Sequence, residues 1–110
     1  MNSESKKDIL ERLFLVLEDR KVNSSENSYV ASLYRDGNNK INEKIIEEAR
    51  EYIEAIKSNE KSSIIHEAAD LWFHTLVSLA LNDLTASDIL EELERRFGQS
   101  GIEEKASRQK

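Results

Sequence analysis

The chain has 110 residues, with no cysteine, no proline, three glycines and a formal net charge of −6 at pH 7. This length predicts a single domain over residues 1–110, and the absence of cysteine excludes disulfides and thiolate metal sites. The acidic balance argues against nucleic acid as a partner, and the charged residues inside the longest apolar stretch argue against a membrane span.

Residues 5–20 predict the first helix, because leucines and a phenylalanine recur there at spacings of three and four. Residues 28–35 predict a short helix that Gly37 breaks. A longer helix is predicted over residues 40–57, where isoleucines and alanines again recur at helical spacing.

The next helix is predicted over residues 60–82, with Asn59 as its N-cap. The last is predicted over residues 85–97, because Thr85 and Asp88 resemble a capping box. Gly98 is expected to take a left-handed conformation just beyond it. These elements predict an all-α fold, a helical bundle of four main helices plus one short helix, with antiparallel long neighbours.

The acids of the helix at 40–57 fall at different angles around its axis. With Ile45 at zero and about 100° per residue, the apolar arc runs from about −40° to about +80°. Glu48 falls on the edge of that arc, at about −60°, and Glu51 just beyond it, at about −120°. These two are neighbours one turn apart, whereas Glu47 and Glu54 fall near the opposite pole and are expected to be solvated.

The helix at 60–82 is apolar nearly all round, which is typical of a helix buried on most sides. In so small a domain this predicts a second copy of the chain as a partner, so that a homodimer completes the bundle. One polar stripe interrupts the apolar surface, and it holds Glu67, Asp70, His74 and Ser78.

Two carboxylates on each of two antiparallel helices can converge on one point. Unpaired buried carboxylates are costly, and a bound cation removes both the burial cost and their mutual repulsion. Oxygen ligands without cysteine favour Mg²⁺, with Mn²⁺ also suitable, over zinc. A di-iron site would instead require Glu-x-x-His pairs. The expected metal ligands are Glu48, Glu51, Glu67 and Asp70.

The pattern E-E-x-x-E followed by E-x-x-D resembles the metal signature of the all-α nucleotide pyrophosphohydrolases, the MazG-like superfamily. Four segments also resemble, in order, those of the phosphoribosyl-ATP pyrophosphohydrolase family. They are "SYVASLYRDGNNKI" (28–41), "IIEEAREYIEA" (45–55), "HEAADLWFHTLV" (66–77) and "RRFGQSGIEEKASR" (95–108). One departure is Ile46, which stands where the family has glycine before the glutamate pair.

The resemblance implies Mg²⁺-dependent hydrolysis of phosphoribosyl-ATP to phosphoribosyl-AMP and pyrophosphate, the second step of histidine biosynthesis. It also implies an ATP-like nucleotide ligand and, together with the lack of cysteine, a cytoplasmic enzyme. Glu48 is a candidate catalytic carboxylate as well as a metal ligand. Glu47 either orients the attacking water or is a solvated surface charge.

Cations must neutralise the substrate's phosphates. The candidate substrate-binding residues are Lys40, Lys44, Arg95, Arg96, Lys105 and Arg108. The last two belong to a basic tail, residues 98–110, which the resemblance implies closes over the substrate. His74 either supports a carboxylate ligand or is a satisfied core histidine. Ser28 and Tyr29 either cap the short helix or line the nucleotide pocket.

Two other functions remain open at this point. A dUTP or general nucleoside triphosphate pyrophosphohydrolase would share the same metal chemistry. A non-catalytic helical dimerisation module would need no metal, although the polar stripe argues against it.

Overall fold

The computed structural model describes residues 9–23 and 28–98, and these fold into helices without any strand. The helices are α2 (Ile9–Val22), α3 (Tyr29–Ser58), α4 (Lys61–Leu81) and α5 (Ala86–Phe97). The predicted all-α class is therefore confirmed. No helix in this part of the chain is both long and apolar enough to cross a membrane.

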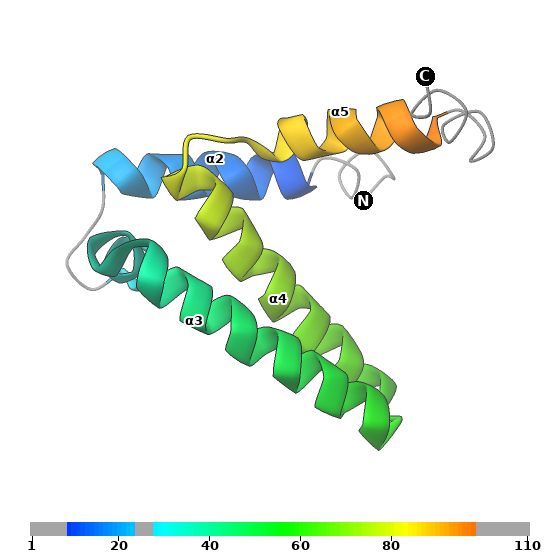
Figure 1. Ribbon diagram of the computed structural model, residues 1–110. Helices are drawn as coiled ribbons and strands as arrows, with labels where there is room; N and C mark the ends of the chain where they lie inside the picture. Colours follow the sequence, from blue (N-terminus) through cyan, green and yellow to red (C-terminus); the bar gives the residue numbers. More distant parts are fainter. Residues whose placement is uncertain (1–8, 24–27, 99–110) are drawn as a thin grey trace.

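The long helices α3 and α4 form an antiparallel hairpin, and α2 and α5 lie across its open end (Figure 1). The core gathers where the four helices meet. It consists of Phe14, Leu17, Leu33, Ile41, Leu76, Val77, Ala80 and Ala86. Removing one such large side chain from water stabilises the fold by roughly 1.5–3 kcal/mol. The arms of the hairpin extend away from this core. The predicted metal ligands, Glu48, Glu51, Glu67 and Asp70, lie on these arms.

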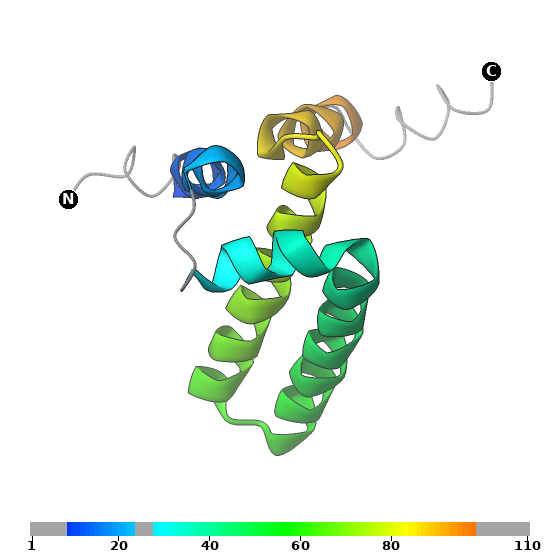
Figure 2. The same ribbon diagram turned by 90° about the vertical axis from the view of Figure 1, so that its left-hand side faces the viewer.

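Gly37 bends α3 near its beginning. Its backbone angles, φ 82° and ψ −171°, are not helical, yet the residues on both sides of it are. The first segment of α3 consequently runs crosswise to the rest, as the cyan ribbon in Figure 2 shows. The break at Gly37 was predicted correctly, but the separation of the helices predicted over residues 28–35 and 40–57 is wrong, because the helix resumes directly after Gly37.

The helix caps agree with local chemistry in two places. Ser28 caps α3, since its hydroxyl accepts a hydrogen bond from the Ala31 N–H at 3.2 Å. Thr85 and Asp88 form the predicted capping box at the start of α5, with bonds of 2.9 and 3.1 Å. Of the two roles left open for Ser28, capping is the one observed.

Two expected cap conformations are wrong. Asn59 ends α3 in the left-handed conformation (φ 59°), and Glu60 is the N-cap of α4 without a side-chain cap bond. Only residues 59 and 60 separate the two helices, so one of them must reverse the chain, and asparagine tolerates that conformation. Gly98 is right-handed (φ −73°), and a Cβ atom there would collide with the Glu94 carbonyl.

The buried face of α3 is rotated from the one expected. It carries Ile41, Glu48 and Ala55, which are seven residues apart and lie on one line along the helix. Ile53 and Ile56, which the apolar arc includes, are instead about half exposed in the single chain, at 53% and 46%. Glu48 therefore lies at the centre of the face that packs on α4, and not at its edge.

Candidate functional site

Three of the four predicted metal ligands converge inside the α3–α4 hairpin. Carboxylate oxygens of Glu48, Glu51 and Glu67 lie within 4.8 Å of one another. Glu48 and Glu51 are one turn apart on α3, and Glu67 comes from the first half of α4. The antiparallel pairing of the two helices brings them together, as the sequence pattern predicts.

Two carboxylates of this group, Glu48 and Glu67, each carry a buried oxygen without a hydrogen-bond partner among the described residues. Glu48 is only 6% exposed. Burial raises the pKa of Glu48, and the neighbouring carboxylates of Glu51 and Asp70 raise it further. Burial and Glu51 likewise raise the pKa of Glu67.

Such an arrangement is unfavourable for a protein without a ligand, because a buried anion needs a cation or hydrogen-bond donors. Two observations indicate that a divalent cation fits this group of carboxylates. Each oxygen that lacks a donor would gain a partner, and the donor set consists of carboxylates, which suit a hard cation such as Mg²⁺.

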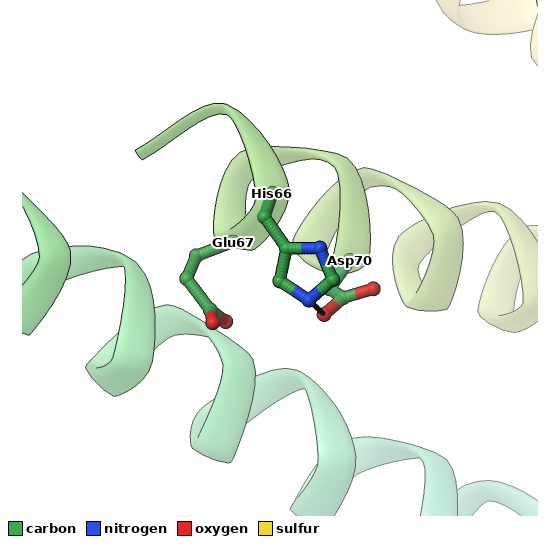
Figure 3. Close-up of side chains that lie close together, drawn as sticks. All are labelled: His66, Glu67 and Asp70. Carbon is green, nitrogen blue, oxygen red and sulfur yellow. Dashed lines mark ion pairs between the residues drawn. The ribbon is translucent and has the colours of Figure 1, made fainter. Parts of the chain in front are cut away.

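Asp70 belongs to an adjoining group. Its carboxylate lies 3.3 Å from the ring nitrogen Nε2 of His66, and these two group with Glu67 within 4.8 Å (Figure 3). Glu67 is thus common to both groups, and it links Asp70 to the glutamates of α3. His66 was not predicted to take part, although its position one turn before Asp70 places both on one face.

Lys44 is the predicted cation that lies beside the carboxylates. Its ammonium donates to Glu47 at 3.1 Å and lies 3.7 Å from Glu48. The hydrogen bond lowers the pKa of Glu47 and raises that of Lys44, so both are charged at neutral pH. Glu47 is exposed, as predicted. Lys40 forms a surface pair with Glu43 at 3.8 Å.

His74 is a buried histidine with a partner on each ring nitrogen. Nδ1 lies 2.8 Å from the backbone carbonyl of Asp70, and Nε2 lies 2.7 Å from the Tyr29 hydroxyl. Neither of these two partners is a carboxylate group, so the observed contacts are those of a buried histidine with both ring nitrogens paired. The observed role of Tyr29, which the sequence left open, is to bond His74 from the start of α3.

The arginines of α5 pair within their own helix. Arg95 and Arg96 both bond Glu92, and together they lower its pKa to about 2. The helix that carries them packs against α2, at the open end of the hairpin (Figure 1). Lys105 and Arg108, with the tail predicted to close over substrate, lie outside the described residues.

An open pocket of about 370 Å³ adjoins the carboxylates on the side of the α3–α4 turn. Glu51 and Glu67 contribute to its wall, together with Arg50 and the serines at both ends of the turn, Ser58 and Ser63. Arg50 was not among the predicted residues. It directly precedes Glu51, so the sequence did place a cation next to a candidate ligand.

Comparison with known proteins adds a family match. The family model described as phosphoribosyl-ATP pyrophosphohydrolase matches residues 10–97. A phosphoribosyl-ATP pyrophosphatase of Methylococcus capsulatus is 52% identical over 101 residues, covering 92% of this chain and 96% of the relative. The one of Hydrogenovibrio crunogenus is 50% identical over 107 residues, covering 94% and 95%.

A longer relative is also similar. The histidine biosynthesis bifunctional protein HisIE of Helicobacter hepaticus is 52% identical over 100 residues. These residues are 91% of this chain but only 43% of that protein, so the chain spans less than half the length of this relative.

Proposed function

The chain belongs to the phosphoribosyl-ATP pyrophosphohydrolase family, and from that premise we propose that it hydrolyses phosphoribosyl-ATP to phosphoribosyl-AMP and pyrophosphate. This reaction is a step of histidine biosynthesis, which the name of the Helicobacter relative also mentions. The observation that carries the proposal is one buried carboxylate oxygen without a donor in each of Glu48 and Glu67, within the segment that matches the family.

The proposed cofactor is Mg²⁺, with Mn²⁺ as a possible substitute. Glu48, Glu51 and Glu67 would hold it, and Asp70 would contribute through the adjoining group. When bound, such a cation neutralises phosphate charge and lowers the pKa of a coordinated water, which makes hydroxide available at neutral pH.

The chain's own residues account for the remaining requirements. Glu47 is exposed and ionised, and would orient the attacking water. Lys44 offers its ammonium protons to phosphate oxygens at the rim of the cluster. Neither group of carboxylates includes a serine or cysteine. Direct attack by water on a phosphorus atom needs no nucleophilic side chain.

The proposed assembly is a cytoplasmic homodimer. Large apolar side chains remain exposed on the two arms of the hairpin, including Ile46, Ile53, Ile65 and Trp72. Exposed apolar area of this kind typically marks an interface. A second copy of the chain would cover it and complete the bundle around the site.

Pyrophosphate release in the presence of Mg²⁺ tests the proposed activity. We expect phosphoribosyl-ATP to be cleaved with a kcat/KM at least about 100-fold above those of ATP and dUTP, since substrate-specific contacts can supply such discrimination. A preference for dUTP or ATP would instead support a general nucleotide pyrophosphohydrolase. Failure to release pyrophosphate from any of the three would support the non-catalytic dimerisation module.

A further inference from the structure

The pocket beside the α3–α4 turn lies where the side chains between the two helices are small. Ala55 is on the buried face of α3, seven residues after Glu48, and Ser58 and Ser63 stand at the two ends of the turn. These short side chains leave a space of about 370 Å³. That volume falls within the roughly 300–1,000 Å³ that is typical of small-molecule sites.

The pocket is continuous with the carboxylates proposed to hold the cation. Glu51 and Glu67 belong to the carboxylate group that also includes Glu48, and both line the pocket. A ligand whose phosphates bind at these carboxylates through a cation can therefore extend into the pocket. Lys44 lies in the other direction along α3, one turn before Glu48. The two ends of the site thus carry different cations, Lys44 at one end and Arg50 at the other.

Two hydrogen-bond donors in the pocket wall are unengaged, one on each helix. Arg50 of α3 is exposed and has no ion-pair partner among the described residues, and the Ser63 hydroxyl of α4 has no hydrogen-bond partner among them. Ser58, by contrast, donates its proton to the Ala55 carbonyl at 2.6 Å. Arg50 and Ser63 are therefore free to donate to a ligand in the pocket.

The glutamates of the wall leave room for an anionic ligand. Glu54 pairs with Lys57, with 3.3 Å between the carboxylate oxygen and the ammonium. Glu51 and Glu67 are proposed cation ligands, so a bound divalent cation offsets their charge. The remaining charge in the wall is the guanidinium of Arg50, whose planar array of donors matches phosphate oxygens.

We propose that this pocket binds the pyrophosphate portion of the substrate, and then the pyrophosphate product, with Arg50 and Ser63 donating hydrogen bonds to its oxygens. The inference rests on the proposed function, because it places the two phosphates that hydrolysis separates from the nucleotide. The substrate then lies along the hairpin, with its pyrophosphate end toward the α3–α4 turn and its nucleoside end toward Lys44.

Calorimetric titration of the full chain with pyrophosphate in the presence of Mg²⁺ tests the pocket. Arg50→Gln removes the guanidinium, and we expect the Kd for pyrophosphate to rise at least about tenfold, as expected from losing a hydrogen bond between charged groups. Ser63→Ala should raise this Kd about two- to tenfold. Neither variant should have a lower melting temperature, because neither side chain loses a partner within the described part of the chain.

Arg35→Gln is the matched control. It makes the same change of charge on the same helix, and Arg35 is likewise exposed but lies before the Gly37 bend and does not line the pocket. The Kd for pyrophosphate should not change in this variant. An equal rise in both arginine variants would assign the effect to net charge and overturn the proposal. So would an unchanged Kd in Arg50→Gln, or a wild-type chain that does not bind pyrophosphate with Mg²⁺.

Titration with AMP tests the orientation of the substrate. AMP has a nucleoside and one phosphate but no pyrophosphate portion, so Arg50→Gln should bind it with the same Kd as the wild type. If Arg50→Gln weakens the binding of AMP as much as that of pyrophosphate, the pocket is not specific for the pyrophosphate end, and the proposed orientation is wrong.

The outcomes for this inference and for the proposed function can be distinguished. If the wild-type chain binds pyrophosphate through Arg50 but does not cleave phosphoribosyl-ATP, the proposed function fails and the phosphate pocket stands. If the wild-type chain cleaves phosphoribosyl-ATP and Arg50→Gln binds pyrophosphate equally well, only the pocket assignment fails.

Discussion

Glu48 occupies a position where an apolar side chain would stabilise the metal-free hairpin better. It lies between Ile41 and Ala55 on the buried face of α3, and one of its oxygens has no donor within the described part of the chain. Burial raises its pKa above the ordinary value of 4.5. The folded chain therefore binds a proton there more tightly than the unfolded chain, and the ionised carboxylate opposes folding at neutral pH.

Replacing Glu48 with glutamine should separate the destabilising effect of its buried charge from its role as a metal ligand. In the absence of metal, we expect Glu48→Gln to melt at the same temperature as the wild type or higher, because a buried charge is removed. Saturating Mg²⁺ should raise the melting temperature of the wild type by binding linkage, and should fail to raise that of the variant.

Glu54→Gln provides the control for that measurement, since Glu54 lies on the same helix but is exposed and pairs with Lys57 at 3.3 Å. It should retain the full Mg²⁺-dependent shift. An equal shift in Glu48→Gln would exclude Glu48 as a metal ligand.

At the level of single residues, helical periodicity predicted which acids share a face. Glu48 with Glu51, and Glu67 with Asp70, were paired correctly, because positions three apart on a helix are always neighbours. The pairing of His66 with Asp70 was not predicted, since it depends on side-chain conformations that periodicity does not set. The hydrogen bond from Tyr29 to His74 joins residues 45 positions apart, which no local pattern reveals.

Among the elements, the bend in α3 has the most direct consequence for the site. Asn38 follows Gly37, and its amide exchanges hydrogen bonds of 2.9 and 3.3 Å with the amide of Asn82 at the end of α4. This pair fixes the bend against α4. The bend in turn sets the direction of the segment that delivers Tyr29 to His74.

Gly37→Ala should therefore lower the stability of the fold. A side chain at φ 82° is strained, so we expect the free energy of unfolding to fall by about 1–2 kcal/mol, measured by urea denaturation.

Asn39→Ala is the corresponding control, as Asn39 is helical and exposed two residues after the bend. It should leave stability unchanged or slightly higher, because alanine is the better helix former. A Gly37→Ala variant as stable as the wild type would show that the bend does not depend on glycine.

Element boundaries were predictable where the deciding chemistry is local. The capping box of Thr85 and Asp88 and the break at Gly37 are properties of a few adjacent residues. The role of Asn59 as the end of α3 was not predictable, because it depends on how closely α4 follows α3. The rotation of α3 was also missed, since the rule that isoleucines face inward fails when the inner face is a polar site and the outer face is apolar.

For the whole molecule, the described residues of one chain leave many large apolar side chains exposed. Besides the isoleucines of the arms, an apolar groove lies between α4 and α5, lined by Trp72, Leu76, Ile89 and Leu93 among others. Trp72, which lines this groove, is 58% exposed. That surface is the basis for the proposed homodimer.

Trp72→Glu should disrupt the dimer. A charge placed at the centre of an apolar interface is costly to bury, so we expect the variant to sediment as a monomer while the wild type sediments with the mass of two chains. Val22→Glu is a suitable control, because Val22 is exposed at the end of α2, away from the hairpin arms. A wild type that is monomeric at micromolar concentration would contradict the proposed assembly.

We propose that the carboxylates inside the hairpin hold a divalent cation with which the chain hydrolyses phosphoribosyl-ATP. The most direct measurement is pyrophosphate release from phosphoribosyl-ATP by the wild-type chain, at increasing Mg²⁺ and again after addition of EDTA. We expect turnover that saturates with Mg²⁺, stops with EDTA and falls at least about 100-fold in Glu48→Gln. Turnover that persists in EDTA, or that Glu48→Gln retains in full, would contradict it.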